Sequence, residues 1–221
     1  MRMVVLEEVE QVRAGFLKYT RKAFLKLPRL ENPRILDIGC GSGVPTIELT
    51  KLSGGKVTGI DIDQSCIDEF NRKIREENLK RVEALNLSLS EMKFPDETFD
   101  VVWSEGVVGN IGFETSLKEW RRLLRKDGYL VIHYQVSRVV DVLPRMPQLG
   151  YSLTDTVPLP EDAWLTEFYK PLEEKMDTLL HKYRNNADAL KLLNQYKTEM
   201  NMVKNNPRNF SCAFYIMKKH S

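Results

Sequence analysis

Short apolar runs alternate with amphipathic segments along residues 34–134 of the chain. The apolar runs, each of strand length, lie at 34–38, 56–60, 82–87, 99–103 and 129–134. Between them apolar residues recur at helical spacing, as Ile67, Phe70 and Ile74 do within the segment 64–78. This alternation predicts an α/β fold in which helices cover both faces of a parallel sheet.

Local signals predict where some of these helices begin and end. Ser65 and Asp68 have the spacing of a capping box, and Asp63 is typical of a turn or cap. A helix is expected over 113–125, before a turn at 126–128 that contains Asp-Gly.

The segments outside this core also have recognisable patterns. A helix is expected over 4–27, and further strands over 150–159 and 211–218. About fifty residues rich in helix formers separate those two strands. We expect a single domain over 1–221, composed of an N-terminal helical lid at 1–33, a core at 34–135 and a helical insertion at 161–207. The insertion is a candidate substrate cover, but its amphipathic spacing is equally compatible with a dimer surface.

Composition narrows the class of protein. A chain of 221 residues that is 42% hydrophobic can bury one sizeable core. With 33 basic and 31 acidic residues the net charge is +2, which gives no large field to attract nucleic acid. We therefore expect no nucleic acid partner, and composition leaves monomer and homodimer open.

The cysteines and the N-terminus indicate a compartment. Cys40, Cys66 and Cys212 are widely spaced, which favours neither a disulfide framework nor a metal site. Residues 1–12 carry three glutamates and lack the apolar run of a signal peptide, and no segment has the length of a membrane span. We expect a cytoplasmic protein that binds no metal and no membrane.

The stretch that ends the first strand carries the strongest candidate chemistry. Asp37 is followed by Gly39, Cys40, Gly41 and Gly43, immediately before the next helix. Glycines let a backbone turn sharply and approach a ligand, and the helix that follows offers free N–H groups. The spacing G-x-G-x-G differs from the dinucleotide fingerprint G-x-G-x-x-G. These residues are candidate cofactor ligands, although a tight turn in another doubly wound fold explains the glycines too.

A second candidate contact follows the second strand. Asp61 lies at its end, about twenty residues after the glycine loop, where a carboxylate can accept hydrogen bonds from both hydroxyls of a ribose. Ile62 is then placed to pack on an adenine ring. The alternatives are a capping role for Asp61 and ordinary core packing for Ile62.

Several stretches resemble one family. The run Leu36–Gly43 resembles the first motif of the class I S-adenosylmethionine-dependent methyltransferases, and Phe94–Ser104 is similar to the family's F-P-D-x-x-F-D-x-V stretch. The chain also resembles an uncharacterised, small-molecule-type subgroup of this family in the stretches Trp103–Gly106 and Asn110–Glu114 and in the Glu-Trp pair that follows them. The resemblance implies a Rossmann-like fold with a seven-stranded, mostly parallel sheet and an antiparallel last strand. It also implies S-adenosylmethionine as methyl donor, S-adenosylhomocysteine as product and a small-molecule acceptor.

The resemblance also assigns roles to individual residues. Ser88 and the Leu89 backbone would contact adenine, although Ser88 stands where the family most often has aspartate. Ser104 and Glu105 would face the methionine portion. Apart from the resemblance, the position of the N-terminal helix as a lid makes Tyr19 a candidate to cover the cofactor, unless it only packs.

The catalytic candidates are Glu105 and His133. Glu105 would act as general base or contact the methionine amino group, and His133 would act as base or simply be buried. The family's N/D-P-P-Y/F motif for exocyclic amines is absent at 104–107, which makes that substrate class less favoured. Two further hypotheses stay open: a non-catalytic S-adenosylmethionine-binding regulator or subunit, and a methyltransferase acting on RNA or protein.

Overall fold

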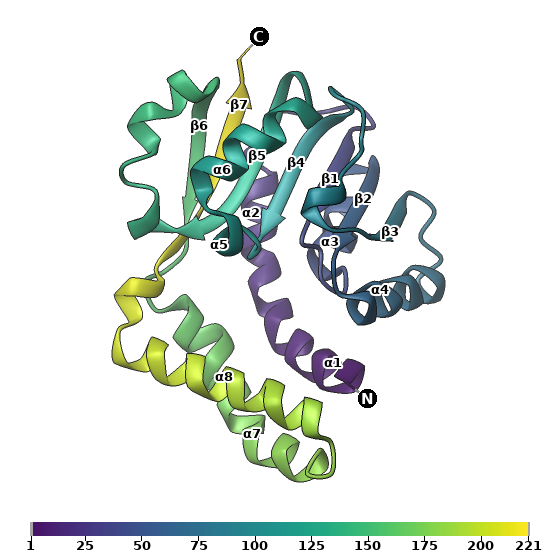
Figure 1. The fold of residues 1–221 in the computed structure, drawn as a ribbon, viewed down its shortest axis with the longest axis vertical. Helices are drawn as coiled ribbons and strands as arrows, with labels where there is room; N and C mark the ends of the chain where they lie inside the picture. Colours follow the sequence, from purple (N-terminus) through teal and green to yellow (C-terminus); the bar gives the residue numbers. More distant parts are fainter. Residues whose placement is uncertain (1, 221) are drawn as a thin grey trace.

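A computed structural model describes residues 2–220, with side chains described from residue 8 onward, so the ends of the expected 1–221 domain lie outside it. The described residues form a seven-stranded sheet in the order β3-β2-β1-β4-β5-β7-β6 (Figure 1). Its strands are β1 (Arg34–Ile38), β2 (Lys56–Asp61), β3 (Val82–Asn86), β4 (Phe99–Glu105), β5 (Leu124–Gln135), β6 (Tyr151–Pro158) and β7 (Cys212–Lys219). The first five strands are parallel, and β7 runs antiparallel to both of its neighbours. The expected topology is confirmed.

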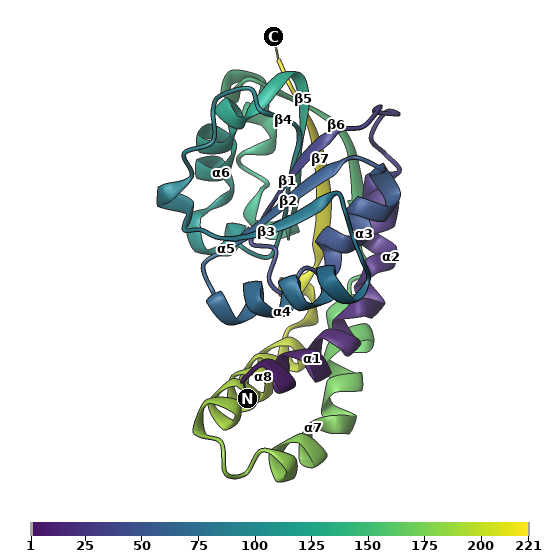
Figure 2. The ribbon, with the colours of Figure 1, turned by 90° about the vertical axis from the view of Figure 1, so that its right-hand side faces the viewer.

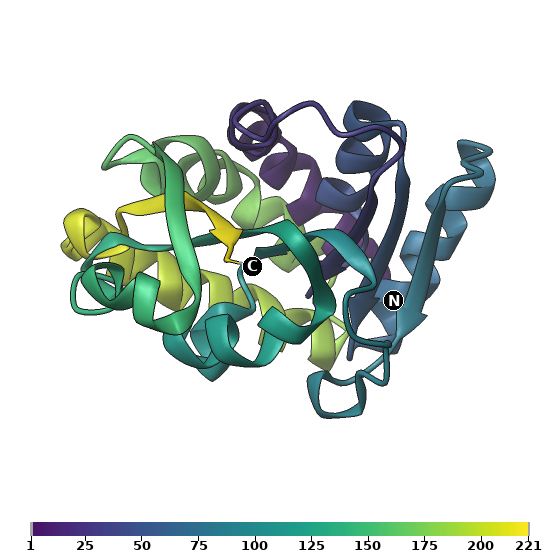
Figure 3. The same ribbon diagram turned by 90° about the horizontal axis from the view of Figure 1, so that it is seen from above.

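Helices cover both faces of the sheet (Figures 2 and 3). The helices are α1 (Arg2–Arg13), α2 (Leu17–Phe24), α3 (Val44–Ser53), α4 (Gln64–Glu76), α5 (Val108–Ile111), α6 (Phe113–Trp120), α7 (Lys170–Lys182) and α8 (Ala187–Asn205). One hydrophobic core packs the four helices α1, α2, α3 and α4 and the insertion against one face of the sheet. A second core packs α5 and α6 against the other face. Because both faces are covered, the central strands are buried along nearly their whole length, as β1 is after Arg34.

The helical insertion lies beyond the carboxyl ends of the parallel strands, where α7 and α8 pack on each other (Figure 1). A six-residue π-helix, Trp164–Tyr169, precedes α7, and a 3₁₀ turn, Pro207–Phe210, follows α8. α1 contacts the π-helix, α7 and α8 as well as α4. The N-terminal segment therefore lies between the core and the insertion.

Some predicted boundaries were wrong. The helix expected over 113–125 ends at Trp120, and β5 begins at Leu124, which pairs with Phe99. The predicted turn at 126–128 falls inside β5, where the register with β4 shifts and Asp127 has a positive φ of 59°. The apolar pair Leu123–Leu124 is fully buried, so tertiary packing draws this segment into the sheet.

The N-terminal helix and one helix start also differ from expectation. The segment expected as one helix over 4–27 is divided by a 3₁₀ turn at Ala14–Phe16. The central residue of this turn is Gly15, a poor helix former. The N-cap of α4 is Asp63, which accepts a hydrogen bond from the Ser65 N–H. The expected capping box of Ser65 and Asp68 is therefore wrong, and the capping role of Asp63 is confirmed.

The strand order fixes where a ligand can bind. β1 lies between β2 and β4, so the chain leaves the middle of the sheet in opposite directions on either side of β1. In open α/β sheets, the crevice at this switch point lies at the carboxyl ends of the strands. The glycine loop after Ile38, Asp61 after β2 and Glu105 at the end of β4 meet at that edge. No helix in the described part of the chain has the length and apolar character needed to cross a membrane.

Candidate active site

The glycine loop connects β1 to α3 by three residues with positive φ, namely 77° at Gly39, 54° at Gly41 and 84° at Gly43. A Cβ on Gly43 would lie 2.1 Å from the ring of Phe70, so this glycine allows α3 and α4 to pack. A Cβ on Gly41 would meet no protein atom within 4 Å. The loop thus leaves open space at Gly41, as a backbone cradle for a ligand requires.

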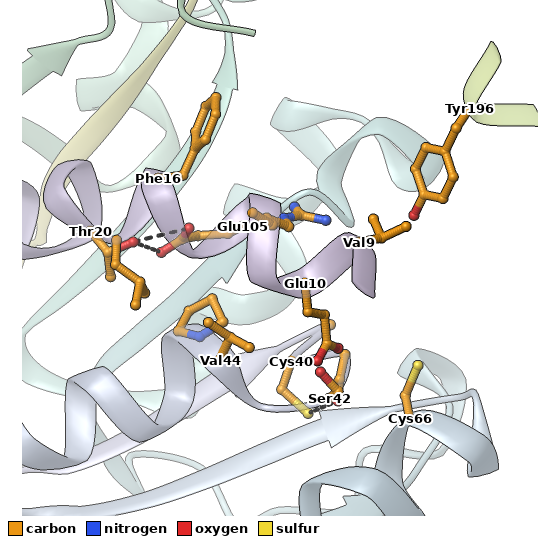
Figure 4. A pocket seen from close by; sticks show the side chains of 15 residues that line it. Val9, Glu10, Phe16, Thr20, Cys40, Ser42, Val44, Cys66, Glu105 and Tyr196 are labelled. Carbon is orange, nitrogen blue, oxygen red and sulfur yellow. Dashed lines mark hydrogen bonds between the residues drawn. The ribbon is translucent and has the colours of Figure 1, made fainter. Parts of the chain in front are cut away.

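A cavity of about 160 Å³ lies between this loop and the N-terminal helices (Figure 4). Its walls include Gly41 and Ser42 from the loop, Arg13 and Thr20 from the N-terminal segment, and Glu105 from β4. Cys40 also lines it and donates its thiol to the Gly41 carbonyl. Burial raises the pKa of the Cys40 thiol, so the group stays protonated and unreactive.

The carboxylate of Glu105 is held at the edge of this cavity. It accepts hydrogen bonds from Thr20 Oγ1 at 3.0 and 3.3 Å and from Trp103 Nε1 at 2.8 Å. Burial raises the pKa of Glu105, while the Trp103 and Thr20 hydrogen bonds act against that rise. These contacts fix the carboxylate, and those from Thr20 tie α2 to the end of β4 (Figure 4).

Arg13 is a residue that the sequence did not single out. It lines the same cavity and forms no hydrogen bond or ion pair with the described residues. Its guanidinium would lie 3.5 Å from a Cβ on Gly106, and its charge opposes the rise that burial causes in the pKa of Glu105. An exposed guanidinium without a partner is suited to bind a carboxylate.

A second cavity, of about 210 Å³, lies on the other side of Gly39, which lines both cavities. Its walls contain Asp61, Ile62, Leu87, Ser88, Leu89 and Asn110. The Asp61 carboxylate accepts hydrogen bonds from the Gly41 and Asp63 N–H groups, each at 2.9 Å, which orients it at the cavity wall. Ile62 is 74% exposed, which is unusual for isoleucine and leaves its side chain available to a flat ligand.

Three expected cofactor contacts do not line these two cavities. Ser104 is fully buried and donates its hydroxyl to the Ile38 carbonyl. Asp37 is buried and accepts a hydrogen bond from Thr46 Oγ1 at 2.6 Å, which fixes α3 against β1. Tyr19 is buried and donates its hydroxyl to Glu167 in the π-helix. Each of these side chains forms a hydrogen bond within the protein, so each one supports the cavity walls without lining them.

His133 stands beside Glu105 in the sheet register, at the end of β5. Burial lowers the pKa of His133 to about 3, with the charge of Arg13 as a smaller cause, so its imidazole is neutral at physiological pH. A group with this pKa is a poor general base, which argues against the catalytic role expected for it. Among the described residues, no cluster of three or more His, Cys, Asp or Glu side chains is arranged to hold a metal.

Comparisons with known proteins agree with this geometry. Residues 36–132 match the methyltransferase domain family. Over 104 residues the chain is 31% identical to demethylmenaquinone methyltransferase of Bacillus subtilis, covering 46% of this chain and 45% of that protein. The chain spans less than two thirds of the length of this and other curated relatives that it matches.

Solved structures share the fold. One is a SAM-dependent methyltransferase from Geobacter sulfurreducens in complex with S-adenosyl-L-homocysteine, with a TM-score of 0.76, 20% identity and coverage of 92% of this chain and 91% of that one. Another is the 4+2 cyclase SpnF, with a TM-score of 0.74, 17% identity and coverage of 91% and 80%. The domain match, the strand order and the G-x-G-x-G loop agree. Residues 36–132 therefore match the methyltransferase domain family, and the described residues have the fold of S-adenosylmethionine-dependent methyltransferases of known structure.

Proposed function

We propose that this chain transfers a methyl group from S-adenosylmethionine to a small-molecule acceptor. The observation that carries the proposal is the pair of cavities that meet at Gly39, one beside Arg13 and Glu105 and the other beside Asp61. An elongated ligand with a charged amino acid end and a nucleoside end matches this pair. The open space at Gly41 leaves room for such a ligand in the first cavity, next to Gly39.

The residues of the first cavity take the amino acid end. The Arg13 guanidinium binds the methionine carboxylate, and the Glu105 carboxylate accepts a hydrogen bond from the methionine ammonium. Thr20 and Trp103 hold Glu105 in place for this contact. We assign Glu105 this binding role in preference to that of general base, because two donors, the Thr20 hydroxyl and the Trp103 indole, already stabilise its carboxylate.

The residues of the second cavity take the adenosine end. The Asp61 carboxylate keeps lone pairs for the two ribose hydroxyls after accepting the Gly41 and Asp63 N–H groups. Ile62 packs on one face of the adenine, and Ser88 and the Leu89 backbone lie at its edge. Ser88 also caps the short 3₁₀ turn at Leu89–Glu91, which fixes that backbone.

A bound sulfonium supplies an activated methyl group without a metal or a covalent enzyme intermediate. The chain's part is then to align an acceptor with that methyl group and to keep water away. α1, α2 and the π-helix are placed to do this, since the Tyr19–Glu167 hydrogen bond and the Lys18–Glu167 ion pair join α2 to the π-helix, which α1 also contacts. We infer that segments 1–33 and 161–207 together cover the site.

The fold alone does not identify the reaction, because a protein named as a cyclase shares it. The test is to incubate the purified protein with methyl-labelled S-adenosylmethionine and a metabolite extract, and to search for a gain of one methyl group by mass spectrometry. The proposal expects a labelled small molecule with wild type and a strong reduction with Asp61→Asn. Binding of S-adenosylmethionine without transfer to any small molecule, protein or RNA would support a non-catalytic regulator or subunit instead. Transfer only to RNA or protein would refute the small-molecule acceptor.

A further inference from the structure

A third cavity, of about 280 Å³, adjoins the proposed cofactor site on the side of the insertion. Gly106, which follows Glu105 directly, lines it, and so does His133, the register partner of Glu105. The Arg13 guanidinium lies next to Gly106 and thus stands between this cavity and the first one. A molecule in the third cavity would therefore adjoin the methionine end of the proposed cofactor site.

The walls of this cavity are mainly flat rings. Trp164 and Tyr169 come from the two ends of the π-helix, Phe210 from the turn after α8, and His133 from β5. The ring centroids of His133 and Trp164 are 6.2 Å apart, and those of Trp164 and Tyr169 are 6.3 Å apart. π-helical turns are rare and occur often at functional sites. Flat walls in a space near the lower end of ligand-pocket volumes, roughly 300–1,000 Å³, favour a planar ligand of one or two rings.

The charges around the cavity distinguish between ligands. Arg138 lines it, is exposed, and forms no hydrogen bond or ion pair with the described residues. No aspartate or glutamate is among the residues that line it. Aromatic walls can also hold an ammonium group, but an ammonium here would lie near Arg138 with no carboxylate in the cavity wall to balance it. The electrostatics favour an anion.

His133 adds a second polar feature to this wall, beside Arg138. Its side chain is 7% exposed, and its Nε2 has no hydrogen-bond partner among the described residues. Buried polar nitrogens in proteins nearly always have a partner, so this unpartnered one leaves an unmet hydrogen bond on a ring that lines the cavity. A neutral imidazole pairs with a hydroxyl or N–H group of the ligand.

We propose that this third cavity binds the methyl acceptor, and that the acceptor is a small planar ring compound with a carboxylate for Arg138 and a hydroxyl or N–H group for His133. This inference rests on the proposed methyltransferase function. Burial keeps His133 uncharged, so its contact selects a polar group and does not compete with Arg138 for the anion.

The experiment measures binding of hydroxybenzoates to the whole protein by fluorescence of Trp164 and by calorimetry, with and without S-adenosylhomocysteine. The probes are 2-, 3- and 4-hydroxybenzoate, the matching hydroxybenzamides, benzoate and benzylamine. The variants are Arg138→Gln and His133→Phe, which keeps a flat ring. The control is Arg208→Gln, which removes the same charge from a side chain that is 87% exposed and does not line this cavity, although it belongs to the turn that contains Phe210.

At least one hydroxybenzoate should bind about tenfold more tightly than its benzamide and than benzoate. Arg138→Gln should abolish the preference over the benzamide, His133→Phe should abolish the preference over benzoate, and Arg208→Gln should keep both. Equal binding of hydroxybenzoate and benzamide, tighter binding of benzylamine, or no binding of any probe at millimolar concentration would overturn the inference. S-adenosylhomocysteine should bind all four proteins equally. If it binds none of them while the carboxylate preference persists, the proposed function fails and the anion site stands.

Discussion

The open space at Gly41 allows a test of the glycine loop with a matched control. Gly41 has a φ of 54° and Gly54, at the end of α3, has a φ of 60°, and a Cβ on either would meet no protein atom within 4 Å. Gly41 lines the first cavity, and Gly54 does not line any cavity described above. Gly41→Ala and Gly54→Ala therefore impose the same backbone strain, but only the first places a methyl group beside the proposed ligand.

The magnitudes follow from the geometry. An alanine in the left-handed region costs roughly 1–2 kcal/mol, so each variant should lose that much stability. In a chain of this length, 1 kcal/mol lowers Tm by about 2–4 °C, so both variants should melt about 2–8 °C below wild type. A methyl group forced into an occupied cradle costs a further ~1–3 kcal/mol, which weakens S-adenosylhomocysteine binding roughly 5- to 150-fold in Gly41→Ala.

The assay combines thermal melts without ligand and calorimetric titration with S-adenosylhomocysteine. Gly54→Ala should bind the ligand with wild-type affinity. If both variants bind equally well while both are destabilised, the loop does not cradle the ligand. If only Gly41→Ala is destabilised, the assumption of equal strain is wrong.

Three further changes test other parts of the site. Asp61→Asn removes a charged acceptor and should weaken S-adenosylhomocysteine binding roughly 10- to 100-fold by calorimetry, whereas unchanged affinity would remove Asp61 from the ribose contact. Burial raises the pKa of Asp37 to about 7, so the stabilising contribution of this group is present below about pH 4 and is lost as the pH rises through about 7. Over that pH range Asp37→Asn should gain stability relative to wild type, by at most about 4 kcal/mol in urea unfolding. Parallel pH profiles of the two proteins would contradict this. Tyr19→Phe removes the hydrogen bond to Glu167 and should lower Tm by about 2–4 °C without changing cofactor affinity, since Tyr19 does not line the cavities; a large loss of affinity would restore the direct contact.

Local patterns predicted the core of the fold well, because each of its elements has its own sequence signal. The strands that carry Asp61 and Glu105 have apolar runs, and the glycine loop has a spacing that few other structures require. The approach of Asp61 to the loop, where it accepts the Gly41 N–H, follows from strand order.

What could not be predicted depends on contacts between distant segments. Arg13 from α1 and Thr20 from α2 share a cavity wall with Glu105, about ninety positions later, and nothing in the local sequence marks them as site residues. Asp37 and Ser104 stand at motif positions, but their neighbours Thr46 and Ile38 take up their hydrogen bonds, and this is visible only in three dimensions.

The β5 boundary and the third cavity show the same limit. Leu124 joins the sheet because Phe99 is beside it, although the Asp-Gly pair that follows is typical of a turn. Trp164 and Arg138 share a cavity wall only because the insertion folds back over the end of β5. Spacing along the chain contains no signal for that juxtaposition.

The central claim is that the cavities meeting at Gly39 form one S-adenosylmethionine site. The most direct measurement is calorimetric titration of the purified wild-type protein with S-adenosylhomocysteine and, separately, with NAD. We expect saturable binding of one S-adenosylhomocysteine per chain and no detectable binding of NAD. Binding of NAD in preference to S-adenosylhomocysteine would contradict the account.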